Sequence, residues 1–116
     1  MPIPKVKKVK CLLITTNDES QVVEIPDTLS QLQSLVHGNI EAIYTRKGIH
    51  CYVNEDGIYK KLPPNRLATR FLFIHLERMP MTESGFILGP MIVLGDGNEG
   101  DEESVPQWVI DEVKSM

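Results

Sequence analysis

The order of apolar and polar positions at the start of the chain predicts a β-hairpin. Apolar residues dominate from Val6 to Thr15 after a lysine-rich lead, which is typical of a well-buried strand. Residues 17–20 (Asn-Asp-Glu-Ser) are turn formers, and apolar positions return at 21–25 before Pro26. We therefore expect two antiparallel strands joined by a turn, with Pro26 ending the second strand.

Leucine and valine then recur with helical spacing. Thr28 and Gln31 stand at the two positions of a capping box, in which their side chains satisfy free N–H groups of the first helical turn. Gly38 follows where a left-handed C-cap is wanted. A single apolar stripe contains Leu29, Leu32, Leu35 and Val36. The pattern predicts a helix over 28–37 that packs against the sheet.

Alternating positions return at 39–45 and 49–53, separated by a turn at 46–48, and predict two further strands. Residues 54–57 (Asn-Glu-Asp-Gly) are suited to a tight reversal with the glycine at positive φ. We therefore expect 58–62 to form a strand that pairs back on 49–53. The two prolines at 63–64 should end that pairing.

The second half of the chain holds three more elements. Asn65 can cap a segment with helical spacing, so we expect at least a helical turn at 66–70, whereas 71–76 could be helix or strand. Residues 86–94 indicate a strand with a bend at Gly89 and Pro90. Ser104 and Gln107 repeat the capping-box spacing, which predicts a C-terminal helix of about 105–115.

This order of elements indicates an α+β domain with a mainly antiparallel sheet, one packed helix and a C-terminal helix, and the first half has a β-grasp-like order. A length of 116 residues with 41% hydrophobic content allows one modest core. We expect a single domain over 1–95 and a C-terminal helix within 104–116. Between them, 96–103 has no apolar side chain and predicts an acidic flexible linker.

The formal net charge is −4, and 7 of the 16 acidic residues lie in 96–116. Nucleic-acid affinity comes mostly from neutralising phosphates, so an acidic chain is an unfavourable binder. The lysines at 5, 7, 8 and 10 are better explained as charges that protect a strand edge. No apolar run is long enough to span a membrane and the start lacks a signal-peptide core, so we expect a cytoplasmic protein.

Catalytic and metal-binding patterns are missing. The histidines and cysteines lie on separate predicted elements without metal-ligand spacing, so we expect no metal and no cofactor. His50 and Cys51 are neighbours on a strand, where successive side chains point to opposite faces, so they form no dyad. No phosphate-binding glycine motif occurs. We therefore expect no enzymatic activity, and we expect Cys11 and Cys51 to be buried free thiols.

Two sets of residues are candidate sites. Asn54, Glu55, Asn65 and Arg66 could converge at one end of the sheet to bind a ligand or partner, with the Arg66 guanidinium making a two-point contact. Turn formation and helix capping would also explain the two asparagines. Trp108 and Val109 are either core anchors or contacts to a second chain in a homo-oligomer.

Four segments carry a family resemblance: Gly38–Glu41, Asn54–Gly57, Leu62–Asn65 and Gly89–Gly95. Together they make residues 8–95 resemble a family of small domains of unknown function carried by bacteriophages and other mobile elements. The resemblance implies a non-catalytic accessory protein of the host cytoplasm that inhibits or redirects a host protein, for example a defence component. The alternative is a protein that sequesters a small nucleotide-like ligand, and a small enzyme is the least favoured reading.

These readings differ in the surface that they require. A flat exposed apolar patch would favour a protein partner, whereas basic residues meeting in a deep pocket would favour a nucleotide-like ligand.

Overall fold

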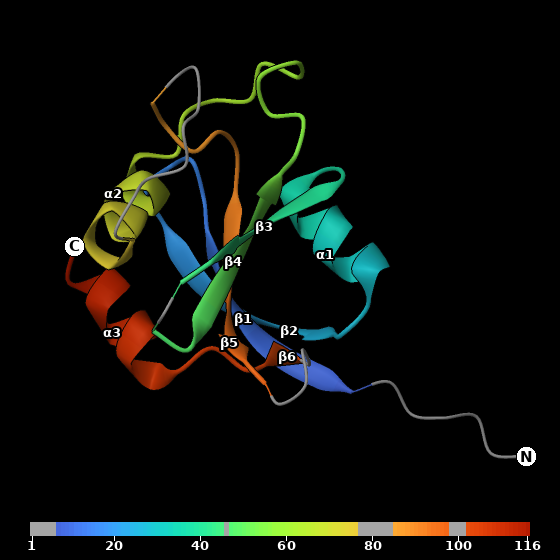
Figure 1. Ribbon diagram of the computed structural model, residues 1–116, viewed down its shortest axis with the longest axis vertical. Coiled ribbons are helices and arrows are strands. Elements are labelled where there is room, and N and C mark those ends of the chain that lie inside the picture. Colours follow the sequence, from blue (N-terminus) through green and yellow to red (C-terminus); the bar gives the residue numbers. More distant parts are fainter. Residues whose placement is uncertain (1–6, 46, 77–84, 98–101) are drawn as a thin grey trace, which may run out of the picture.

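An antiparallel sheet with helices on both faces forms the body of the protein, as the computed structural model shows (Figure 1). The structure describes residues 7–45, 47–76, 85–97 and 102–116. The α+β class predicted from the sequence is confirmed. In chain order the elements are β1 (Lys8–Ile14), β2 (Ser20–Pro26), α1 (Leu29–Val36), β3 (Ile40–Tyr44), β4 (Ile49–Asn54), α2 (Arg66–His75), β5 (Met91–Asp96), β6 (Glu102–Glu103) and α3 (Gln107–Lys114).

The strand order is β2-β1-β5-β4-β3, and the short β6 pairs with the end of β5. The two predicted hairpins, β1–β2 and β3–β4, are therefore separated by β5, which pairs antiparallel with β1 on one side and β4 on the other. β5 is a nearly continuous apolar run, as expected for a strand buried on both faces. Within the described part of the chain, β2 and β3 form the two edges of the sheet.

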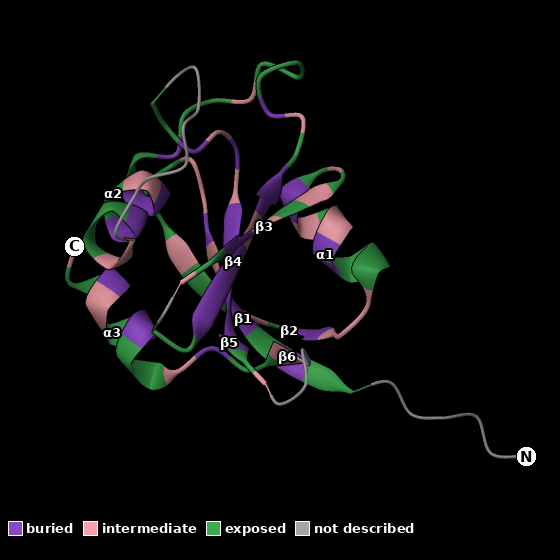
Figure 2. Cartoon of the chain, in the orientation of Figure 1, coloured by how far each residue is buried: buried purple, intermediate pink, exposed green. Residues whose placement is uncertain are grey.

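Each face of the sheet has its own core. α1 covers one face, where Leu32 and Val36 pack with Ile92 and Leu94 of β5. α2 and α3 cover the other face (Figure 1), where Phe71 of α2 lies in a second, larger apolar cluster. β4 and β5, two inner strands of the sheet, are almost wholly buried (Figure 2). The C-terminal helix is therefore a core element, with Val109, Ile110 and Val113 buried.

The helix predicted over 28–37 is present as α1, with two differences in detail. The Thr28 hydroxyl accepts a hydrogen bond from the Gln31 N–H, as a capping residue should. Leu29 is 58% exposed and does not join the buried stripe. The left-handed residue is His37, with φ of 65°, one position before Gly38, because the helix closes earlier than predicted.

The strand predicted at 58–62 is wrong. β4 already pairs with β3 on one side and β5 on the other, so neither edge is free for another strand. Residues 55–61 instead form successive turns, closed by hydrogen bonds such as that from the Leu62 N–H to the Gly57 carbonyl. Gly57 is not at positive φ, and Lys61 is, with φ of 52°.

Three further predictions, for α2, β5 and α3, can be compared with the structure. Residues 71–75 are helical, as part of α2. The last long strand begins only at Met91, after a loop in which Gly89 has φ of 81°. Ser104 does not cap α3, because its hydroxyl accepts the Lys10 N–H, and Pro106 precedes the helix without a side-chain cap.

The segment predicted as a flexible linker contains ordered strand at both ends. Asp96 ends β5, and Glu102 and Glu103 form β6. Residues 98–101 of that segment, Lys5, and the predicted loop at 79–84 lie outside the described residues. Among the helices that the structure describes, none is long and apolar enough to cross a membrane.

Candidate functional site

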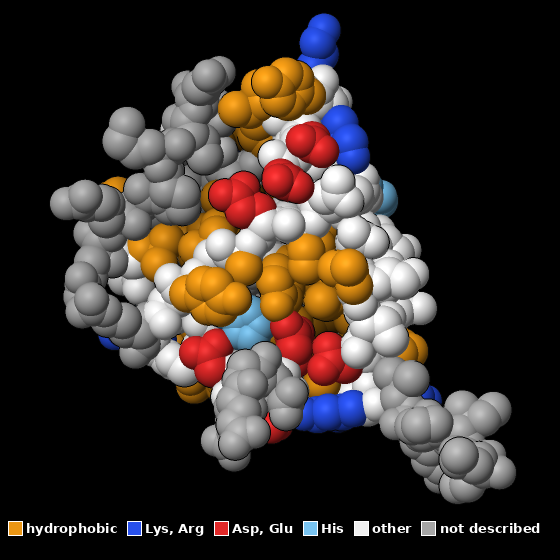
Figure 3. Space-filling view, turned by 45° about the vertical axis from the view of Figure 1, so that its right-hand side comes forward, with side chains coloured by type: hydrophobic (Ala, Val, Ile, Leu, Met, Phe, Trp, Pro, Cys, Tyr) orange, Lys and Arg blue, Asp and Glu red, His pale blue; other side chains and the backbone are white. Residues whose placement is uncertain are grey.

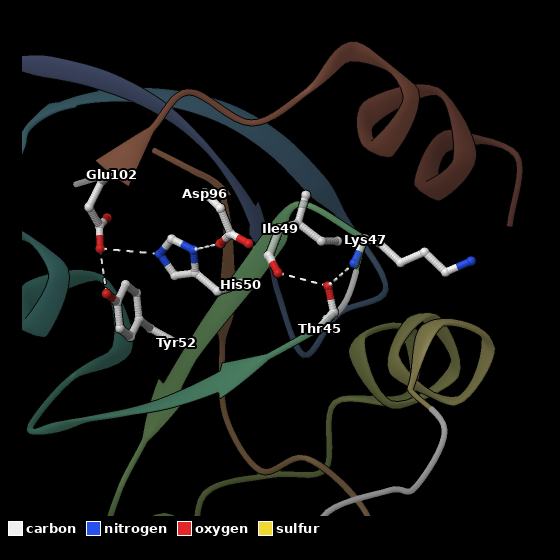
Figure 4. Close-up of polar contacts among 7 residues, drawn as sticks. All are labelled: Thr45, Lys47, Ile49, His50, Tyr52, Asp96 and Glu102. Carbon is white, nitrogen blue, oxygen red and sulfur yellow. Dashed lines mark hydrogen bonds and ion pairs between the residues drawn. The ribbon is translucent and has the colours of Figure 1, made fainter. Parts of the chain in front are cut away.

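One histidine lies between two carboxylates at the end of the sheet where β6 pairs with β5 (Figure 4). His50 Nδ1 is 2.6 Å from Asp96 Oδ1, and His50 Nε2 is 3.2 Å from Glu102 Oε1. The Tyr52 hydroxyl donates a hydrogen bond to the same Glu102 oxygen. We call His50, Tyr52, Asp96 and Glu102 the His50 cluster.

Strand periodicity and pairing bring these residues together. His50 and Tyr52 are two positions apart on β4 and so share the face that α1 covers, whereas Cys51 between them faces the other core. Asp96 ends β5 beside them. A Cβ atom at Gly95 would lie only 2.7 Å from the Ser104 carbonyl oxygen, so glycine at this position lets residues 102–104 approach β5 closely.

Lys7 contacts both residues of β6. Its ammonium donates a hydrogen bond to the Glu102 carbonyl at 2.6 Å and lies 3.6 Å from a Glu103 carboxylate oxygen. Lys7 therefore fixes the short strand β6 through the Glu102 backbone and the Glu103 side chain, and β6 positions the Glu102 side chain in the cluster.

The contacts favour a charged imidazole. Burial of the ring disfavours its charged form, but the hydrogen bonds to Glu102 and Asp96 outweigh burial and raise the pKa of His50. Burial also opposes ionisation of Glu102, yet the hydrogen bonds from His50 and Tyr52, with the nearby charges, lower the pKa of its carboxyl. Burial and the adjacent carboxylate raise the pKa of Tyr52. These contacts thus favour an imidazolium over a neutral ring between the two carboxylates.

This arrangement is poorly suited to proton transfer. Both ring nitrogens of His50 already face carboxylates, so neither is free to accept a proton from a substrate. Cys51 is fully buried on the other face, and burial raises the pKa of its thiol to about 12. In the part of the chain that the structure describes, no group of three or more His, Cys, Asp or Glu side chains is placed to hold a metal ion.

Two tyrosines make the surface around the cluster aromatic. The Tyr44 ring centroid lies 5.8 Å from that of His50, and the Tyr52 ring meets His50 edge-on at 5.2 Å. Tyr44 is 70% exposed and the Asp96 side chain is 41% exposed. Among the described residues, the buried Glu102 Oε2 has no hydrogen-bond partner. On this face a histidine lies among acidic and hydrophobic side chains (Figure 3). We call Tyr44, Tyr52, Asp96 and Glu102 the acidic–aromatic surface.

The two predicted asparagines are buried, and their amides are used within the chain. Asn54 donates to the Val36 carbonyl and accepts the Asp56 N–H, so it forms the predicted turn. Asn65 accepts the Ala68 N–H as the cap of α2, and its amide nitrogen donates to two further backbone carbonyls. Glu55 and Arg66 are exposed, and a binding role for them stays a prediction.

A groove of about 270 Å³ lies near Asn65, between the end of β1, the end of α1 and the loops at 62–63 and 89–90. Leu13, Leu35 and Leu62 make its lining mostly apolar, and His37 and two threonines add polar groups. None of the described residues that line it is lysine or arginine. None of Asn54, Glu55, Asn65 and Arg66 lines it either.

The two residues predicted at an interface differ in exposure. Val109 is fully buried in the core of its own chain. Trp108 is 41% exposed, and its ring centroid lies 5.3 Å from that of His75, which joins α3 to α2. The side chain of Val109 therefore packs in the core of its own chain, whereas an interface role for Trp108 stays a prediction.

We predicted none of the residues of the acidic–aromatic surface from the sequence. The alternation within β4 does indicate that His50 and Tyr52 share a face. The sequence does not indicate that Glu102 lies on the same face, because the two residues of β6 are too few to show an alternating pattern.

Comparison with known proteins gives one match. No curated protein and no solved structure matches the chain significantly. The model of a family described as "Domain of unknown function (DUF3846)" matches residues 9–116, which include all of the described helices and strands apart from Lys8 at the start of β1. The chain therefore belongs to the DUF3846 family of domains of unknown function.

Proposed function

We propose that this protein is a non-catalytic binding protein whose acidic–aromatic surface contacts a basic side chain of a protein partner. The observation that carries the proposal is that the exposed Tyr44 ring and the partly exposed Asp96 carboxylate both lie against His50. A guanidinium or ammonium group is attracted both to the face of an aromatic ring and to a carboxylate. The largely buried Glu102 carboxylate adds a second negative charge next to His50.

The same features weigh against a nucleotide-like ligand. Phosphates require positive charge or free backbone N–H groups, and the acidic–aromatic surface offers carboxylates. The part of the chain that the structure describes gives the groove near Asn65 a mostly apolar lining without lysine or arginine. Sequestration of a small nucleotide-like molecule is therefore our second candidate. An enzyme comes last, because both nitrogens of His50 are already hydrogen-bonded.

For the biological setting, we propose an accessory protein of a bacteriophage or mobile element that inhibits or redirects a host protein, such as a defence component. The resemblance of residues 8–95 to domains carried by such elements supports this setting. A location in the host cytoplasm is supported by two buried free cysteines, which suit a reducing compartment.

The test compares partner capture by matched variants. The full chain would be used as bait in lysate of infected bacteria, and the captured protein would then be titrated against purified variants. Tyr44→Ala removes an exposed ring that makes no hydrogen bond within the described chain, and should weaken binding about tenfold or more. Asp18→Asn, in the exposed turn between β1 and β2, is the control and should bind as wild type.

Asp96→Asn completes the test by removing charge while keeping shape. It should also weaken binding, and the loss should shrink at high salt, because screening already reduces the charge contribution there. Normal partner binding by both Tyr44→Ala and Asp96→Asn would contradict the proposal. Release of a nucleotide from the denatured bait, without a captured protein, would instead support the second candidate.

A further inference from the structure

The outer edge of β3 has free hydrogen-bonding groups. The Thr45 N–H donates to Ile49 O, and the Glu55 N–H donates to Asn39 O, at the two ends of the β3–β4 ladder. Along an antiparallel strand, successive residues direct their N–H and C=O groups to opposite sides of the strand. The odd-numbered residues between these two bonds therefore point theirs at β4. Ile40, Ala42 and Tyr44 therefore point theirs outward, where no other described segment pairs with them.

The opposite edge of the sheet is protected, and β3 is not. By the same alternation, β2 directs the backbone of Ser20, Val22, Glu24 and Pro26 outward. Pro26 has no N–H group and Glu24 carries a charge, which are two common ways of blocking edge pairing. The outward positions of β3 hold neither a proline nor a charged residue. β3 is the edge suited to accept another strand.

We propose that β3 pairs with β3 of a second copy of this chain, antiparallel and across a two-fold axis at Ala42, so that two sheets become one. In this register Ile40 lies opposite Tyr44 of the second copy, which makes an aliphatic–aromatic cross-strand pair at each end. Glu41 lies opposite Ile43, so no like charges face each other directly. The small Ala42 side chain leaves room for the two strands at the axis.

Charge and symmetry favour a second copy of this chain as the partner of the β3 edge. The two-fold axis brings the turn that contains Lys47 beside the opposite end of the second copy's β3–β4 hairpin, where Glu55 is exposed. The opposite charges lie at facing ends of the two hairpins, which favours this antiparallel arrangement. Pairing of β3 with β2 would instead build an open filament, and Pro26 and Glu24 oppose it. A β3–β3 contact is closed and uses the unprotected edge of both chains.

The dimer would also set the geometry of the proposed binding surface. Tyr44 and Tyr52 lie on one face of the sheet, so a two-fold axis at Ala42 places two acidic–aromatic surfaces on the joined sheet, on either side of the axis. The dimer does not depend on the proposed partner. A dimer that binds no partner, or a monomer that binds one, would separate the two ideas.

The test is the mass of the full chain as a function of concentration, by sedimentation or light scattering. The wild type should rise from 13.1 kDa toward twice that mass as concentration increases. Ala42→Lys places two like charges opposite each other at the axis and should keep the mass at 13.1 kDa. Ser20→Lys adds the same charge at an outward position of β2 and should dimerise as wild type.

Ala42→Pro gives a second, independent variant. The Ala42 N–H points away from β4, so proline removes only an outward donor and should also hold the mass at the monomer value. Both variants should keep the wild-type circular dichroism spectrum, and if the proline variant unfolds, the lysine variant decides. A wild type that stays monomeric up to about 1 mM overturns the proposal. So does a dimer that persists in Ala42→Lys.

Discussion

Replacing His50 by glutamine should destabilise the protein mainly by leaving its carboxylates without a counter-charge. The Glu102 side chain is only 12% exposed, so its charge would lose its main compensation in a largely buried site. Removing one member of a buried pair costs roughly 3 to 5 kcal/mol. Asp96 is 41% exposed and is screened by solvent, which reduces the expected loss to about 2 to 4 kcal/mol.

The pH dependence gives the sharper signature. The pKa of His50 is raised above its ordinary value of 6.5, so its contribution is fully present below that pH and is lost as the pH rises through the folded-state pKa. The pKa of Glu102 is lowered from 4.5, so its contribution is present above that value and is lost as the pH falls further. Stability should therefore be greatest between about pH 4.5 and 6.5 and fall on both sides.

Urea denaturation from about pH 2 to 9 would measure both effects. The fall in stability above pH 6.5 should be present in the wild type and absent from His50→Gln. His37→Asn is the control, because His37 is exposed and asparagine tolerates its left-handed backbone. The reasoning fails if His50→Gln matches the wild type within about 0.5 kcal/mol, or if both lose stability equally above pH 6.5.

Three further predictions concern the core. Asn65→Ala should cost roughly 2 to 4 kcal/mol in denaturant unfolding, because it uncaps α2 and removes the hydrogen bonds that the Asn65 amide donates to two buried carbonyls, and a loss under 1 kcal/mol would contradict this. Leu32→Ala should lower the unfolding free energy by roughly 2 to 5 kcal/mol, whereas Leu29→Ala, on the same helix but exposed, should change it by under about 0.5. Thiol titration should find no reactive cysteine in the native protein and two after denaturation, and fast native labelling of Cys11 or Cys51 would refute their burial.

The elements that sequence patterns predicted well are those in which local chemistry and tertiary packing agree. Thr28 caps α1 and Asn65 caps α2, because each side chain meets an N–H group a few residues away. The alternation in β3 and β4 likewise depends on nearby positions. These contacts need no knowledge of the rest of the chain.

The wrong prediction of a strand at 58–62 has its cause in β5, which lies more than 30 residues after β4 in the chain and pairs with it. Residues 58–62 have a reasonable local pattern for a hairpin, but the edge of β4 that they would use is occupied by β5. The same long-range pairing places β1 beside β5 and separates the two hairpins. Local periodicity contains no information about which distant strand takes an edge.

The acidic–aromatic surface could not be predicted from the sequence for a similar reason. A charged stretch rich in glycine, such as 96–103, is ordinarily a solvated linker, and composition alone favours that interpretation. Its two ends are instead fixed by specific contacts: Asp96 and Glu102 each meet a nitrogen of His50, and Lys7 anchors the short strand. A charge run therefore has to be examined together with the buried histidines and tyrosines of the fold. Histidine on a strand face next to an unexplained acidic segment is the combination that would have identified this site.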